Sequence, residues 1–116
     1  MTSMSAAASW EVHEQTAVGE LVDRPLVLWH MIMSLVFLAV AILAGFLFSL
    51  QFLQGYPLEG IEIFSPGRWR VIHTNGVAYG FLANAFLAGL YWAVPRMTLH
   101  PVFNKNLSWT IFYVWQ

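Results

Sequence analysis

The feature that most constrains this sequence is a pair of long apolar runs without any Asp, Glu, Lys or Arg. The first run extends from Pro25 to Leu58 and the second from Val71 to Val94. Each exceeds the roughly 20 apolar residues that an α-helix needs to cross ~30 Å of hydrocarbon. Because unpaired backbone groups are unfavourable in lipid, a spanning segment of this kind must be helical. The sequence therefore predicts two transmembrane helices.

The composition agrees with this interpretation. Of 116 residues, 59% are hydrophobic and 9% are charged, which lies outside the range of ordinary soluble domains. The net charge of -1 is small and scattered, so we expect contact with membrane lipid and no nucleic-acid partner. The absence of cysteine excludes disulfides, thiolate metal sites and covalent c-type haem attachment within the chain. The expected fold class is all-α, an integral membrane helical bundle.

The boundaries of the first helix are well marked. Asp23 is suited to cap the helix N-terminus, and Pro25 lies in the first turn, where the missing N–H is not needed. Gly55 and Pro57 interrupt the helical pattern at the other end. These signals predict a helix over about 25–53.

The second helix follows a Ser-Pro-Gly turn signal at residues 65–67. We expect it to cover about 70–95 and to end at Pro95. A third helix is expected to start near residue 106, in an apolar run that stops at Gln116 and is too short to cross a membrane alone. Two full transmembrane helices and the start of a third indicate a polypeptide that continues, or a split or accessory subunit.

Residues 1–24 are expected to form a polar N-terminal tail and residues 25–116 a transmembrane segment. The tail has no basic residue before Arg24, so it lacks the positive region of a secretory signal. The positive-inside rule favours a cytoplasmic N-terminus. That orientation places three cations in the cytoplasm and two on the opposite side, namely Arg24, Arg96 and Lys105 against Arg68 and Arg70.

His73 stands near the head of the second apolar run and is the principal candidate for a functional site. At 100° per residue, a mostly small or polar stripe lies within about 60° of it: Gly76, Val77, Gly80, Asn84, Leu87 and Tyr91. One interpretation is a close helix-packing face in which His73 hydrogen-bonds a neighbouring helix. The other is ligation of a metal or haem iron, with Gly76 and Gly80 leaving room for the macrocycle and an unidentified acceptor fixing the second ring nitrogen. The pattern leaves both open.

Two arginines precede this histidine. Arg68 and Arg70 are suited to bind anionic groups at the same membrane face, such as haem propionates, and equally suited to anchor lipid headgroups. The remaining histidines are His13, His30 and His100. None of these three is expected to be a ligand.

The stretch "GRWRVIHTNGVAYGFLANAFLAGLYWAVPR" resembles the start of the catalytic subunit I of haem-copper oxidases, most closely that of the cbb3-type cytochrome c oxidase. The His-Thr-Asn triplet that opens the second helix carries the resemblance, which extends over residues 26–116. Nitric oxide reductases share this triplet. The arginine-containing approach "GRWR" favours the oxidase.

The resemblance implies that His73 is an axial ligand of a low-spin haem b, with its helix starting toward the outer face. Arg68 and Arg70 would then lie on the propionate side, and Gly76 and Gly80 beside the haem. The family's second axial histidine, its high-spin haem b and its copper site require positions that this chain does not contain. No catalytic residue is therefore expected here, and the chain alone is not expected to reduce oxygen.

The implied assembly is a cytochrome c oxidase complex in the bacterial inner membrane, where electrons from cytochrome c reduce oxygen. Its expected partners are the remaining helices of subunit I, or a split partner chain, and c-type cytochrome subunits. The alternatives are a segment of a nitric oxide reductase large subunit and a non-catalytic membrane accessory subunit. Non-haem iron in place of copper in the complex would indicate the nitric oxide reductase. A His73 that does not contact iron would indicate the accessory subunit.

Overall fold

The computed structural model describes residues 19–116, and within that range it contains helices and loops but no strand. The expected all-α class is thus confirmed for the described part of the chain. Two helices, Arg24–Phe52 and Pro66–Thr98, are long and apolar enough to cross a membrane. Only 17% of the most apolar window of each is buried within the chain, unlike the core helix of a soluble domain.

The first helix consists of α2 (Arg24–Ser49) and a terminal 3₁₀ turn, η1 (Leu50–Phe52). The predicted N-cap is confirmed, since Asp23 Oδ1 accepts a hydrogen bond from the Leu26 N–H at 3.4 Å. The turn ends at Leu53, whose backbone is extended. The loop beyond it contains Gly55 in a left-handed conformation (φ 76°), which glycine adopts without strain.

The second helix is longer than its sequence signals indicate. It runs without interruption through α3 (Pro66–Asn75), η3 (Gly76–Leu82) and α4 (Ala83–Thr98). It begins at Pro66 instead of 70 because proline at the first helical position starts the helix. Pro95 was expected to end it and does not: the helix continues to Thr98 and stops at Leu99 in a left-handed conformation. A proline removes one backbone bond, and a helix supported by neighbouring helices tolerates that loss.

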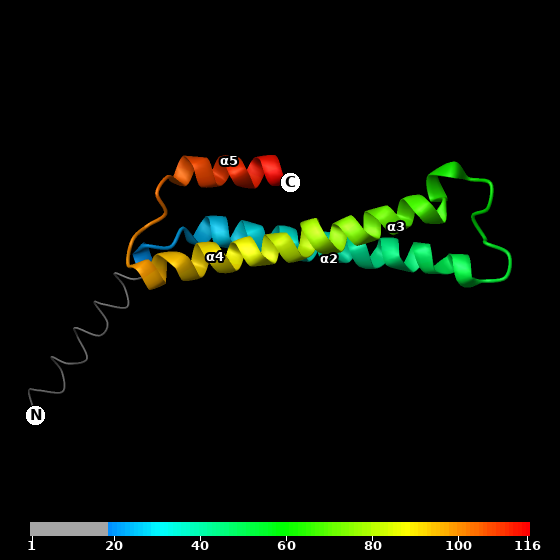
Figure 1. Cartoon of the computed structure of the whole chain (residues 1–116), viewed down its shortest axis with the longest axis horizontal. Helices are drawn as coiled ribbons and strands as arrows, with labels where there is room; N and C mark the ends of the chain where they lie inside the picture. The colour runs from blue at the N-terminus through cyan, green and yellow to red at the C-terminus, as the bar shows by residue number, and fades with distance from the viewer. Residues whose placement is uncertain (1–18) are drawn as a thin grey trace, which may run out of the picture.

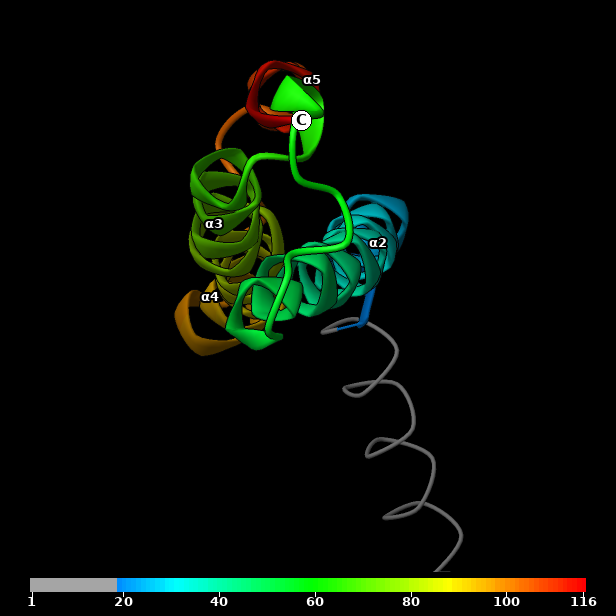
Figure 2. The ribbon, with the colours of Figure 1, turned by 90° about the vertical axis from the view of Figure 1, so that its right-hand side faces the viewer.

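The two long helices lie antiparallel and side by side (Figures 1 and 2). Their contact depends on glycines in the second helix. A methyl group placed on Gly76 would lie 3.2 Å from Ala41 Cβ, and one placed on Gly80 would lie 2.5 Å from Phe37 Cγ. Small residues at such positions let two backbones approach closely.

Segment η3 is a π-helix, in which a backbone N–H donates to the carbonyl five residues earlier. The bond from the Ala83 N–H to the Ala78 carbonyl closes the segment. Three carbonyls within it accept a side-chain donor: Tyr79 O from Trp115 Nε1 at 3.2 Å, Gly80 O from Asn84 Nδ2 at 2.8 Å, and Phe81 O from Ser34 Oγ at 3.0 Å. The widened turn is therefore supported by polar side chains of both long helices.

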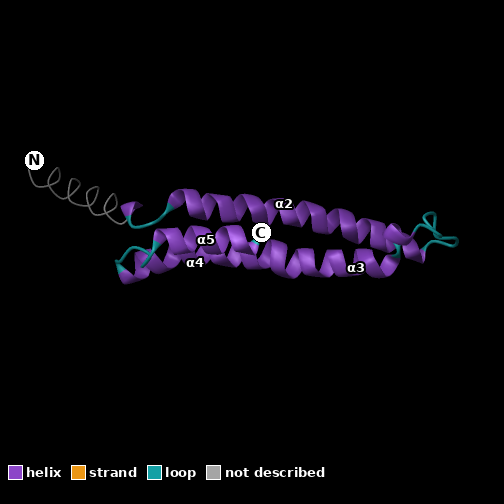
Figure 3. Cartoon of the chain, turned by 90° about the horizontal axis from the view of Figure 1, so that it is seen from above, coloured by secondary structure: helices purple, strands orange, loops and turns teal. Residues whose placement is uncertain are grey.

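Helix α5 (Lys105–Trp115) packs against the first half of α2, and in the view from above it overlies α4 (Figure 3). Four side-chain hydrogen bonds attach α5 and its C-cap Gln116 to earlier parts of the chain: Trp109 Nε1 to Asp23 Oδ2 at 3.3 Å, Trp115 Nε1 to the Tyr79 carbonyl at 3.2 Å, Gln116 Nε2 to Asn84 Oδ1 at 2.9 Å, and Asn84 Nδ2 to Gln116 Oε1 at 3.4 Å. The third helix is thus attached near its middle and at its C-terminal end.

A buried polar cluster joins the three helices. His30 and Asn84 are both 0% exposed, and Nδ1 of His30 bonds Asn84 Oδ1 at 2.8 Å. Because Asn84 Nδ2 donates to the Gly80 carbonyl, the amide oxygen faces His30, and Nδ1 of His30 must carry the hydrogen. The ring stacks on Tyr91 and meets the edge of Phe112.

Replacement of Gly80 by alanine is expected to destabilise the helix pair by about 1–3 kcal/mol, because the added methyl group overlaps Phe37. Gly89→Ala is the matched control, since no atom lies within 4 Å of its added carbon. The measurement is the thermal midpoint of the detergent-solubilised protein. Equal midpoints for the two variants would contradict the packing described here.

Asn84→Leu is expected to loosen α5, because it leaves the His30 N–H and the Gln116 amide without their shared acceptor. Amide exchange in Lys105–Trp115 should accelerate by about tenfold, the effect of roughly 1.4 kcal/mol of local stability. Asn106→Leu, at an exposed position of α5, serves as the control. Unchanged protection in Asn84→Leu would show that the cluster does not hold α5.

Candidate functional site

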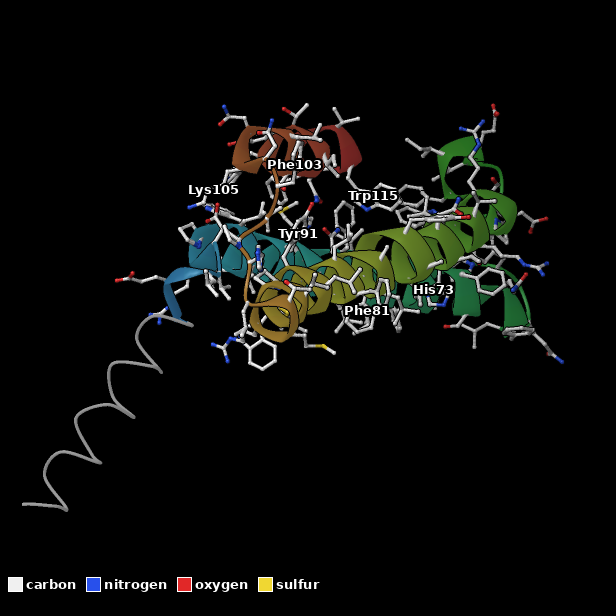
Figure 4. The ribbon with its side chains drawn as sticks, turned by 60° about the vertical axis from the view of Figure 1, so that its left-hand side comes forward. His73, Phe81, Tyr91, Phe103, Lys105 and Trp115 are labelled. Atoms are coloured by element: carbon white, nitrogen blue, oxygen red, sulfur yellow. The ribbon has the colours of Figure 1, made fainter. Side chains whose placement is uncertain are left out.

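His73 lies in α3 with one ring nitrogen turned toward α2, and Figure 4 shows it well separated along the bundle from Tyr91. Its Nδ1 is 2.7 Å from the carbonyl oxygen of Ala41. A carbonyl oxygen can only accept, so Nδ1 carries the hydrogen and donates it. The neutral ring then has an unprotonated Nε2, which is the form that binds a metal.

The Nε2 atom of His73 is not enclosed by the chain. Among the described residues, the buried side-chain nitrogens without a partner are His30 Nε2 and Trp69 Nε1. His73 Nε2 is not one of them, and no described group hydrogen-bonds it, so it reaches the surface of the helix pair.

Gly45 completes the contact between His73 and α2. A methyl group built on it would lie 2.8 Å from Nδ1 and 2.9 Å from Cε1 of His73, too close for real atoms. The imidazole therefore occupies the space that any side chain at this position would fill. The sequence reasoning singled out neither Gly45 nor Ala41. Their small-x-x-x-small spacing on the first helix, which matches that of Gly76 and Gly80 on the second, is the signal that was available.

Gly76 and Gly80 face the same helix as His73. On this face, a carbon added to Gly76 would meet Ala41, and one added to Gly80 would meet Phe37. Gly76 contacts Ala41, the residue whose carbonyl bonds His73. The two glycines thus act on His73 by setting the distance between the helices.

The two arginines differ in their surroundings. Arg68 forms the one ion pair found within residues 19–116, with Glu62, and both side chains are largely exposed. Arg70 is exposed, and its backbone carbonyl accepts the Thr74 hydroxyl at 2.9 Å. Between them, the Trp69 ring stacks on Phe64 with centroids 5.9 Å apart. Arg68 is therefore paired with Glu62, whereas Arg70 belongs to no ion pair within residues 19–116.

The other histidines lie in different settings. His13 is outside the described residues, and exposed His100 has its Nδ1 2.8 Å from the Thr98 carbonyl. His30 has the same tautomer as His73, but its Nε2 is buried and its ring is packed against two aromatic rings. No group of three or more His, Cys, Asp or Glu able to hold a metal ion occurs in residues 19–116.

The chain is similar to two cytochrome c oxidase proteins. It is 33% identical over 75 residues to the cytochrome c oxidase subunit 1 homolog of Agrobacterium tumefaciens (strain T37). It is 30% identical over 81 residues to cytochrome c oxidase subunit 1 of Rhodobacter capsulatus. Each match covers 64% of this chain, but the chain spans only 14% and 15% of the length of these relatives.

No family model matches the chain, and no solved structure matches it. The two similarities nevertheless support a relation to subunit I of the haem-copper oxidases. Together with the two apolar helices, they indicate a membrane protein.

Proposed function

We propose that the chain is the N-terminal portion of the catalytic subunit of a respiratory terminal oxidase of the cbb3 type. In this proposal, His73 supplies one axial ligand to a low-spin haem b. The complex transfers electrons from cytochrome c to oxygen at a high-spin haem b and copper held by other parts of the assembly. The similarity to cytochrome c oxidase subunit 1 and the resemblance of the "GRWRVIHTN" stretch support it.

The observation that carries the proposal is the arrangement around His73. Its Nδ1–H is bound to the Ala41 carbonyl at 2.7 Å, and its Nε2 has no hydrogen-bond partner among the described residues and is not fully buried. A neutral imidazole with one nitrogen fixed by a hydrogen bond and the other open is what haem iron accepts. His30 serves as an internal comparison, because the same tautomer there is enclosed by Tyr91 and Phe112 and offers no approach to a macrocycle.

Within this site, haem b would supply one-electron transfer, and the chain would hold and orient it. The Ala41 carbonyl fixes the plane and the tautomer of His73, and the close packing at Gly76 and Gly80 keeps α2 within reach. We assign Arg70 to the propionate side, since it lies one turn before His73 and belongs to no ion pair within residues 19–116.

The proposed setting is the bacterial inner membrane with the N-terminus in the cytoplasm, as the distribution of Lys and Arg favours. The exposed apolar surface of both long helices would contact lipid and the remaining helices of subunit I, supplied by the same or a split chain. The c-type cytochrome subunits would be the electron donors of the assembled complex.

The first test compares His73→Ala with His100→Ala in the purified native complex. His73→Ala is expected to lose the low-spin haem b band from the reduced-minus-oxidised optical spectrum, because the iron loses an axial ligand. His100→Ala should keep the band, since that side chain is exposed and bonded only to the nearby Thr98 carbonyl. A full band in His73→Ala would remove the ligand assignment and leave the accessory-subunit interpretation.

Metal analysis of the same preparation separates an oxidase, with copper, from a nitric oxide reductase, with non-haem iron.

Arg70→Gln is expected to lower the midpoint potential of the low-spin haem, because a nearby positive charge favours the reduced form. Arg68→Gln is the matched control and should have the smaller effect, since the Arg68 charge is already compensated by Glu62. Potentiometric titration of the haem band measures both variants. An unchanged potential in a variant that carries both substitutions would show that neither arginine acts on the haem.

A further inference from the structure

We propose that Gly45 is a positioning residue for His73, because the missing side chain uncovers the Ala41 carbonyl that binds the imidazole. This inference rests on the proposed role of His73 as a haem ligand and extends it to the opposite helix. According to this inference, Ala41 and Gly45 on α2 set the basicity of the histidine ligand and thereby the haem potential.

The Ala41 carbonyl is open to His73 because position 45 has no side chain. In an α-helix the carbonyl of residue 41 already accepts the N–H of residue 45, and the side chain at 45 leans back over the preceding turn. Any side chain at position 45 would therefore cover the Ala41 oxygen on this face. With glycine there, the second lone pair of the oxygen remains open, and His73 Nδ1 reaches it at 2.7 Å.

The His73 ring fits against Gly45 so closely that it leaves no room for a methyl group. The carbon of an alanine at 45 would lie 2.8 Å from Nδ1 and 2.9 Å from Cε1. These are the two ring atoms on the bonded side of the imidazole, so a methyl group would displace the ring from the carbonyl. The backbone of α2 cannot yield easily, because Ala41 and Phe37 are already in contact with Gly76 and Gly80.

The hydrogen bond at Nδ1 of His73 also changes the electronic properties of Nε2. A hydrogen bond from Nδ1–H to a strong acceptor raises the basicity of Nε2, and a more basic ligand favours ferric over ferrous iron. In a membrane interior no water replaces a lost acceptor. Displacement of His73 from Ala41 would thus weaken the ligand and raise the haem potential.

The test is a redox titration of the low-spin haem in the native complex, comparing Gly45→Ala with Gly89→Ala. Both variants add the same methyl group to a long helix, but only the first meets another residue. We expect an upward shift of the midpoint potential in Gly45→Ala and none in Gly89→Ala. Equal potentials in the two variants would overturn the inference.

If Gly45→Ala fails to assemble, the unmodified complex decides the question. Pulsed electron paramagnetic resonance of the ferric low-spin haem measures the quadrupole coupling of the ¹⁴N nucleus at Nδ1, which depends on the strength of its hydrogen bond. A value typical of a strongly bonded N–H supports the inference, and a value typical of a free N–H overturns it. Retention of the low-spin band in His73→Ala would instead refute the proposed function, so the two failures are distinguishable.

Discussion

The hydrogen bond between His73 and the Ala41 carbonyl is the constraint on which the arrangement of the two long helices depends. Inside hydrocarbon an imidazole N–H has no water to bind, and an unpaired polar group there is strongly unfavourable. The bond requires the two backbones to approach closely, which the contacts of Gly45, Gly76 and Gly80 permit. The small residues around His73 therefore allow its N–H to be hydrogen-bonded where no water is present.

The two ends of the helix pair resolve a comparable problem in different ways. At one end, the His73 N–H binds a main-chain oxygen and leaves the second nitrogen accessible. At the other, the His30 N–H binds the side chain of Asn84, and aromatic rings cover the rest of the imidazole. Only the first arrangement leaves a nitrogen for an outside group. The second connects α2, α4 and α5.

Much of the fold could be predicted from the sequence because the thickness of a bilayer determines the length of an uncharged helix. The two spans and the Asp23 cap followed from this rule and from capping chemistry. The extent of the second helix did not, because Pro66 and Pro95 each fit either a boundary or a helical position, and packing decides between them. The π-helical segment η3 has no simple local signature, since its carbonyls are bound by Ser34 and Asn84, which lie outside it.

The candidate site was predictable in part. His73 stood out as a polar residue in an apolar run, but the sequence could not show which group binds its second nitrogen. The acceptor proved to be a backbone carbonyl 32 positions earlier in the chain, and every residue type has such a carbonyl. The glycine stripe was correctly placed on the histidine's face, whereas its partner surface at Ala41 and Gly45 became apparent only from the helix pairing.

A main-chain acceptor has a consequence for how this site can change over evolution. No substitution at position 41 can delete the carbonyl, so selection cannot preserve it through a particular polar side chain. What selection can act on is volume, at the positions that decide whether the carbonyl is reachable. The hydrogen-bonding partner of His73 would therefore leave its trace among related sequences as a size limit at 41, 45 and 76, in columns that carry no polar chemistry of their own.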